Sequence, residues 1–84
     1  MKNEKLARKA YEDYKLELRK EKELQELLSA KRKEAHLKAK KGEFVKIDEV
    51  VEIYDEISSI EEQLEKIRRD IDILAKLIIK YVFG

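Results

Sequence analysis

Several residue types are scarce or missing in this sequence. Its 84 residues include no cysteine, no proline and no tryptophan, only two glycines and a single histidine. Without cysteine the chain has no disulfide, no thiol nucleophile and no thiolate zinc ligand, and one histidine cannot form a histidine-rich metal site. Proline and glycine mark the turns of β folds, so their scarcity favours long helices. We therefore expect an all-α protein without a bound metal or cofactor.

Charged residues are what the sequence has in excess. They make up 46% of the chain, against about a quarter in ordinary proteins, and 20 Lys and Arg nearly balance 19 Asp and Glu to leave a net charge of +1. A chain this short buries only about 60% of its unfolded surface, which is too little for a deep substrate cleft. We therefore expect a non-enzymatic protein that gains buried area by associating with itself.

No targeting or membrane-spanning segment is visible in the sequence. The first 26 residues carry charges throughout and lack the apolar stretch of a signal peptide. No uncharged run approaches the ~20 residues of a membrane span. We expect a cytoplasmic protein that does not insert into a membrane. A helix lying on a membrane surface stays open as an alternative for residues 71–83, where Lys76 and Lys80 border a wide apolar face.

One interruption divides the chain into two helical segments. Residues 2–41 contain no glycine or proline, and Gly42 is then followed by β-prone residues. Glycine commonly ends a helix, and Asp48 is of a type that caps the start of the next one. We predict a single domain over residues 1–84, a long antiparallel helical hairpin of the coiled-coil type. Its first helix spans about 3–41, its bend 42–48 and its second helix about 49–83.

The second segment carries the strongest periodic pattern in the sequence. Apolar or aromatic residues recur at alternating spacings of three and four for more than four heptads. A mean spacing of 3.5 residues predicts a left-handed supercoil, and isoleucine at both kinds of seam position disfavours a simple parallel dimer. The residues of this seam are Val50, Ile53, Ile57, Ile60, Leu64, Ile67, Ile71, Leu74, Ile78 and Tyr81.

The first segment offers a much more polar face to that seam. Its apolar stripe is interrupted by Glu21, Gln25 and Arg32. We expect Tyr11 and Tyr14, one helical turn apart, to pack as core aromatics beside the end of the second helix. The stripe consists of Ala7, Tyr11, Tyr14, Leu18, Leu28, Ala35 and Ala39.

The end of the second segment is too apolar for one partner helix to cover. From Ile71 onward only Asp72, Lys76 and Lys80 interrupt its apolar residues, and these three share one narrow stripe. The excess apolar surface predicts a homo-oligomer that closes through the C-terminal third of the chain. The predicted interface residues are Ile53, Ile57, Ile60, Leu64, Ile67, Ile71, Leu74, Leu77, Ile78 and Tyr81.

The balanced net charge hides two opposed halves. Residues 1–41 hold 14 basic and 8 acidic side chains, whereas residues 42–84 hold 6 and 11. In a hairpin the two runs lie side by side, so pairing between the helices and with their dipoles explains this pattern. A nucleic-acid surface repeated by the symmetry of an oligomer is the alternative. The residues for such a contact are Lys31, Arg32, Lys33, Lys38, Lys40 and Lys41.

The bend carries the string Gly42-Glu43-Phe44-Val45, which an acidic pair and a valine follow at 48–50. This string resembles the small subunit of phage terminases. In that family a charged helix with an Ala-Lys-rich end runs into a Gly-Glu-Leu/Phe-Val turn, followed by an acidic pair and a valine. The resemblance implies an assembly hairpin in viral DNA packaging, with DNA and the terminase large subunit as partners and the host cytoplasm as location. In that family an N-terminal helix-turn-helix module recognises the packaging site; residues 1–84 contain no such module, so specific reading of DNA is not carried over to them. The matching residues are Gly42, Glu43, Phe44, Val45, Asp48, Glu49 and Val50.

A protein-binding adaptor is the alternative from another functional class. A short β-prone stretch followed by a heptad helix is also similar to prefoldin-like chaperones, whose subunits assemble through strands between two coiled-coil arms. Those strands are longer than the seven residues of 42–48 allow. An inhibitor that acts by coiled-coil contact with another protein also remains open.

Overall fold

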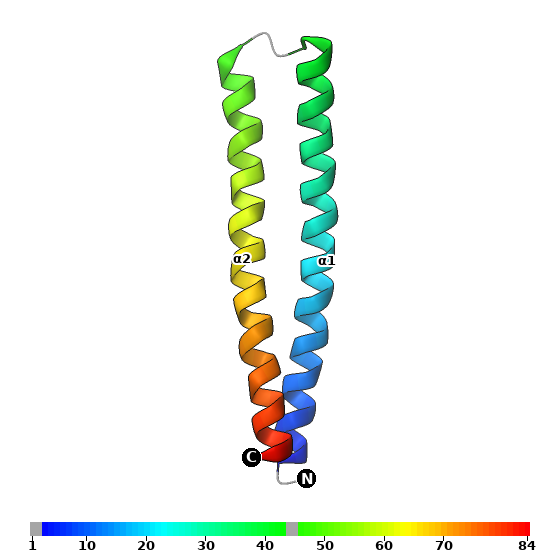
Figure 1. Ribbon diagram of the computed structural model, residues 1–84, viewed down its shortest axis with the longest axis vertical. Coiled ribbons are helices and arrows are strands. Elements are labelled where there is room, and N and C mark those ends of the chain that lie inside the picture. The colour runs from blue at the N-terminus through cyan, green and yellow to red at the C-terminus, as the bar shows by residue number, and fades with distance from the viewer. Residues whose placement is uncertain (1–2, 44–45) are drawn as a thin grey trace.

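Two long helices form an antiparallel hairpin in the computed structural model, which describes residues 3–43 and 46–84 (Figure 1). The helices are α1 (Glu4–Lys41) and α2 (Ile47–Phe83). The molecule measures 61 × 15 × 13 Å, and its two ends lie together opposite the bend. The predicted all-α helical hairpin is confirmed. Phe44 and Val45, which belong to the terminase-like string, lie outside the described residues.

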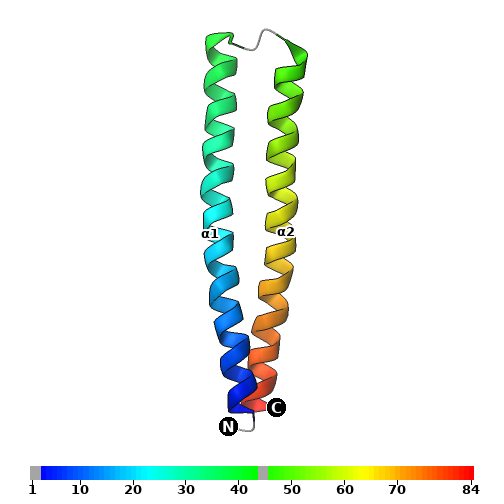
Figure 2. The ribbon, with the colours of Figure 1, turned by 180° about the vertical axis from the view of Figure 1, so that it is seen from behind.

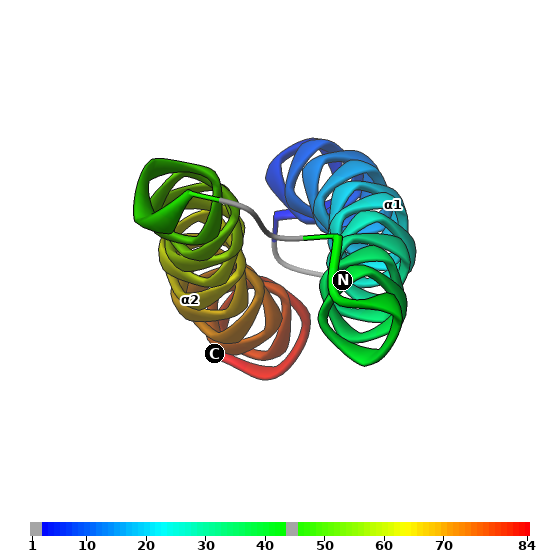
Figure 3. The ribbon, with the colours of Figure 1, turned by 90° about the horizontal axis from the view of Figure 1, so that it is seen from above.

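The two helices wind around each other along the length of the hairpin. Both run without a break when the molecule is seen from behind (Figure 2). Seen from above, the pair of helices turns anticlockwise with increasing depth, which is a left-handed supercoil (Figure 3). This is the hand that a repeat of 3.5 residues imposes on helices with 3.6 residues per turn.

Gly42 ends α1 through a left-handed backbone conformation. Its φ of 67° places it in the region that only glycine enters at little cost. The N–H of Gly42 donates to the carbonyl oxygen of Ala39 at 3.2 Å, and the N–H of Glu43 donates to that of Lys38 at 2.9 Å. These two hydrogen bonds make a Schellman cap, which satisfies carbonyls that the end of a helix otherwise leaves unpaired.

The prediction that Asp48 caps α2 is wrong. The helix begins at Ile47, and the cap residue is Lys46, which has extended backbone angles and no side-chain hydrogen bond to the helix. Only the backbone closes the first turn, where the N–H of Glu49 donates to the carbonyl of Lys46 at 3.2 Å. Asp48 and Glu49 instead lie inside the first turn, where their carboxylates interact favourably with the positive end of the helix dipole.

The α2 heptad pattern faces a matching pattern on α1 that is only partly apolar. About one residue in each turn of α1 is buried or half-buried along this line, again at alternating spacings of three and four. We call these residues the α1 seam and the heptad residues of the second helix the α2 seam. The α1 seam consists of Ala7, Ala10, Tyr14, Glu17, Glu21, Leu24, Leu28, Lys31, Ala35 and Lys38.

The predicted apolar stripe of α1 was therefore partly wrong. Tyr11, Leu18 and Ala39 each lie one position away from the α1 seam and are exposed. Tyr11 is not a core aromatic but is 49% exposed; its ring stacks on Tyr14 at a centroid distance of 6.4 Å. Lys15 Nζ lies 4.9 Å from the centre of the Tyr11 ring, a cation–π contact on the surface.

Replacing Gly42 tests the cap of α1. Gly42→Ala forces a side chain into the left-handed region, and we expect it to lower the free energy of unfolding by about 1 kcal/mol. For a domain of this size that corresponds to a fall in Tm of about 4–8 °C. Gly42→Asn is the matched control, because asparagine tolerates this conformation, and it should lose less. Equal losses in the two variants, measured by circular dichroism, would contradict the assignment of the cap.

Candidate functional site

The apolar core is confined to the half of the hairpin nearest the bend. We call residues 22–43 and 46–65 the bend half, and residues 3–21 and 66–84 the terminal half. In the bend half, four α2 residues pack with Leu28, and Leu24 and Ala35 lie against this cluster. Among the described residues of the terminal half, only Ala7 and Ala10 are buried. The four α2 residues are Ile53, Ile57, Ile60 and Leu64.

The predicted interface residues therefore fall into two groups. Ile53, Ile57, Ile60 and Leu64 are already covered by α1 of their own chain, with Leu64 only 2% exposed. The other six are half-buried and keep surface for a further contact. Their role between subunits stays a prediction. These six are Ile67, Ile71, Leu74, Leu77, Ile78 and Tyr81.

The reason for this difference lies in the α1 seam. In the terminal half it offers the small side chains of Ala7 and Ala10, the half-buried Tyr14 and two carboxylates. The Glu17 side chain is only 16% exposed and lies 3.1 Å from Lys20 Nζ, while that of Glu21 is 24% exposed and accepts a hydrogen bond from Arg68 Nε at 3.3 Å. Charged groups keep contact with water, so they cannot seal the apolar α2 seam as Leu24 and Leu28 do.

Exposed apolar side chains occur on both flanks of the terminal half. A shallow groove of about 310 Å³ between the helices includes Leu16, Ile73 and Leu74 in its lining. Ile73 is 55% exposed. On the opposite flank, where Arg68 reaches Glu21, helical periodicity places Tyr11 and Ile79, and Ile79 is 58% exposed. One partner helix on one flank would leave the other flank uncovered.

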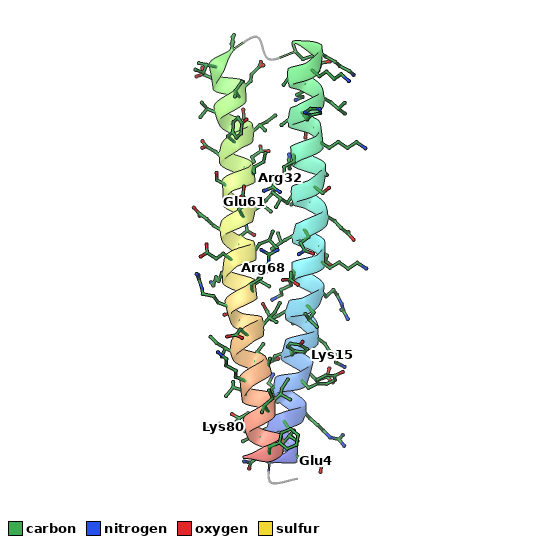
Figure 4. The ribbon with its side chains drawn as sticks, in the orientation of Figure 1. Glu4, Lys15, Arg32, Glu61, Arg68 and Lys80 are labelled. Atoms are coloured by element: carbon green, nitrogen blue, oxygen red, sulfur yellow. The ribbon has the colours of Figure 1, made fainter. Side chains whose placement is uncertain are left out.

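The six basic residues proposed for nucleic-acid contact divide equally. Lys31 lies 2.9 Å from Glu56, and Arg32 lies 3.5 Å from Glu61 across the hairpin, as Figure 4 shows for the second pair. Lys38 lies 3.3 Å from Glu34 on its own helix. Within the described residues, the remaining three lysines make no ion pair, and they are exposed. These three are Lys33, Lys40 and Lys41.

The cross-helix contact of Lys31 raises its pKa. The pKa lies above the ordinary value of 10.5, first because of the hydrogen bond with Glu56 and then because of attraction to the same carboxylate. A raised pKa in the folded state means that the stabilisation is fully present below the ordinary lysine pKa and is lost as the pH rises through the raised value. The pair between the helices is therefore intact at neutral pH.

Other chemistry-bearing groups are dispersed. In the described ranges 3–43 and 46–84, no three His, Cys, Asp or Glu side chains are grouped so that they could hold a metal ion. The single histidine, His36, is exposed on α1. Over the same two ranges, neither helix has a stretch that is both long enough and apolar enough to cross a membrane.

Comparison with models of protein families, with curated proteins and with solved structures found no match to this chain. The resemblance to terminase small subunits therefore rests on the residues at the bend alone.

Glu17 tests the cause of the weak packing in the terminal half. Glu17→Leu places an apolar side chain on the α1 seam, and we expect it to raise the free energy of unfolding by about 1 kcal/mol in urea denaturation. Glu12→Leu is the control, because the Glu12 side chain is 68% exposed and lies outside the seam. A loss of stability in Glu17→Leu, or an equal gain in the control, would contradict the seam assignment.

Proposed function

We propose that this chain is a non-enzymatic assembly module that associates with further copies of itself through its terminal half. The observation that carries the proposal is the apolar surface left open there, on the six half-buried α2 residues and on both flanks. Contiguous apolar surface on a small soluble protein is typical of an interface. The bend half also exposes apolar side chains, such as Val51 and Tyr54, but its α2 seam from Ile53 to Leu64 is buried, so the open seam residues belong to the terminal half.

Stability favours the same conclusion. A chain of this length that forms two helices has a small core, and small domains commonly need a further source of buried area such as oligomerisation. The chain has no cysteine for a disulfide. A neighbour that covers Ile73 and Ile79 would supply the missing area at the place where the hairpin packs least well.

The process that we propose for this module is DNA packaging of the terminase type. The support is the resemblance at the bend, where Gly42 ends α1 and Glu43 completes the cap. The terminase large subunit would then be the protein partner. An adaptor of the prefoldin-like type or an inhibitor, which would bind a different protein through the same apolar surface, is the rival, and it predicts a monomer in the absence of that partner.

Absolute mass by light scattering behind size exclusion, over a dilution series, tests self-association. We expect the wild type to be oligomeric and Ile73→Glu together with Ile79→Glu to shift the midpoint of association by at least about tenfold in concentration, because a buried unpaired charge costs several kcal/mol. Both residues are exposed in the single hairpin, so the helices should form as before.

The matched control replaces two equally exposed apolar residues of the bend half, Val51→Glu together with Tyr54→Glu. It should shift the midpoint of association far less than the Ile73 and Ile79 pair does. A wild type that is monomeric at every concentration, or equal effects of the two double variants, would reject the proposed assembly surface.

DNA contact is a second candidate, favoured by the three lysines that have no partner among the described residues. We expect a salt-sensitive gel shift of a short DNA duplex that is lost when Lys33, Lys40 and Lys41 become Gln, since each phosphate contact releases counterions. Replacing the exposed Lys5, Lys22 and Lys66 by Gln removes the same charge elsewhere and should retain the shift. No shift by the wild type at low salt would end this hypothesis.

A further inference from the structure

We infer that neighbouring copies lie side by side with their bends at the same end, so that the basic end of α1 in one copy runs beside the acidic start of α2 in the next. This inference rests on the proposed self-association and concerns the orientation of the copies within it. Two features of the hairpin carry it: where its apolar surface lies, and how its charges are divided along each helix.

The apolar surface is the first feature. The open α2 residues and the exposed Leu16, Ile73 and Ile79 all lie in the terminal half. Copies with their bends at the same end bring terminal half against terminal half over its full length. Copies that overlap fully in the opposite direction would bring each open terminal seam against a neighbour's bend half, whose seam residues from Ile53 to Leu64 are already buried, so the two open seams would not meet.

The charge along α2 changes sign at its midpoint, which is the second feature. Residues 46–65 carry eight acidic side chains and one basic, whereas residues 66–84 carry five basic and two acidic. On α1, residues 31–41 carry six basic side chains and one acidic. In a same-end arrangement this basic run meets the acidic part of the neighbour's α2. In the fully overlapped opposite arrangement it meets the basic part, and like charges suppress that pairing.

Several of these charged side chains lie outside the ion pairs that the hairpin forms within itself. Lys31 and Arg32 pair with Glu56 and Glu61, but a set of acidic and basic side chains in the bend half makes no ion pair with any described residue. These side chains are exposed on the surface, where a neighbour's opposite charges can approach them. They are Lys33, Lys40 and Lys41 on α1 and Asp48, Glu49, Glu52, Asp55 and Glu62 on α2.

One competing arrangement also joins apolar to apolar surface. Two hairpins that overlap only by their terminal halves would point their bends in opposite directions. That arrangement leaves the opposed charges of the bend halves without partners. The bend-to-bend separation then exceeds the 61 Å length of one hairpin. The position of the bends therefore distinguishes the same-end arrangement from both opposite ones.

Because the chain has no cysteine, one introduced cysteine carries a spin label that reports only distances between copies. The Glu43→Cys label at the bend tests orientation by pulsed electron paramagnetic resonance. We expect a distance of about 20–35 Å, which is two to three helix spacings of 8–10 Å plus the label arms. The Lys22→Cys label near the middle of α1 is the control, which should also give a short distance.

The outcomes separate the inference from the proposed function. Short distances from both labels support the same-end arrangement. An oligomeric mass without a short distance at position 43 overturns the orientation and leaves the proposed self-association standing. A monomeric mass without a short distance at either position overturns both.

Reversing the charges of the two segments provides a second test. Only the same-end arrangement predicts that two charge-reversed variants assemble poorly alone and well when mixed. One variant carries Lys33, Lys40 and Lys41→Glu, and the other carries Asp48, Asp55 and Glu62→Lys. In each variant alone the three exchanged side chains face residues of their own sign in the neighbour, so we expect each alone to need at least about tenfold more protein to assemble and an equal mixture to recover the wild-type mass. Unimpaired assembly of each variant by itself would contradict the inferred contact.

Discussion

The structure depends on how well two facing rows of side chains match. The α2 seam is apolar from Val50 to Tyr81, whereas the α1 seam is mixed. Its bend half has Leu24 and Leu28 beside two lysines, and its terminal half has two alanines, one tyrosine and the carboxylates of Glu17 and Glu21. Where Leu24 and Leu28 meet the α2 seam, the hairpin has a core. Where Glu17 and Glu21 meet it, the same kind of α2 residue stays half-buried. The supercoil holds both rows in contact throughout, so the difference arises from composition and not from geometry.

This mismatch connects stability with assembly. A leucine at position 17 or 21 would extend the core, but it would also close the surface that we propose for self-association. Glu21 joins the two helices through Arg68, and Glu17 pairs with Lys20 on its own helix, while the α2 side chains stay accessible from the flanks. The weakest part of the single hairpin and its proposed interface are thus the same residues, as expected where binding supplies part of the folding free energy.

The sequence contains enough information for the hairpin and less for the details of its contacts. Gly42 and the α2 heptads predicted two helices and their order, because a left-handed cap and an apolar repeat are visible in residue types. The α1 seam was missed because Glu17, Lys31 and Lys38 are not apolar, so a search for apolar residues selected Tyr11 and Leu18 one position away. Following the spacing of three and four from Ala7 regardless of polarity identifies it. The cap was misplaced because residue type favours Asp48, whose carboxylate can accept a cap hydrogen bond, whereas the helix begins at Ile47 after Lys46 without a side-chain cap.

The six basic residues near the bend show how a charge pattern divides between folding and binding. Lys31 and Arg32 are held by acids of α2, and Lys38 by Glu34, so half of the run is explained within the chain. Lys33, Lys40 and Lys41 could bind either the carboxylates of a neighbouring copy or the phosphates of DNA. Both contacts weaken in salt, so salt dependence alone does not separate them. Assembly does separate them, because lysines engaged by a neighbour in the oligomer are not available to DNA, whereas a DNA surface would strengthen as copies accumulate.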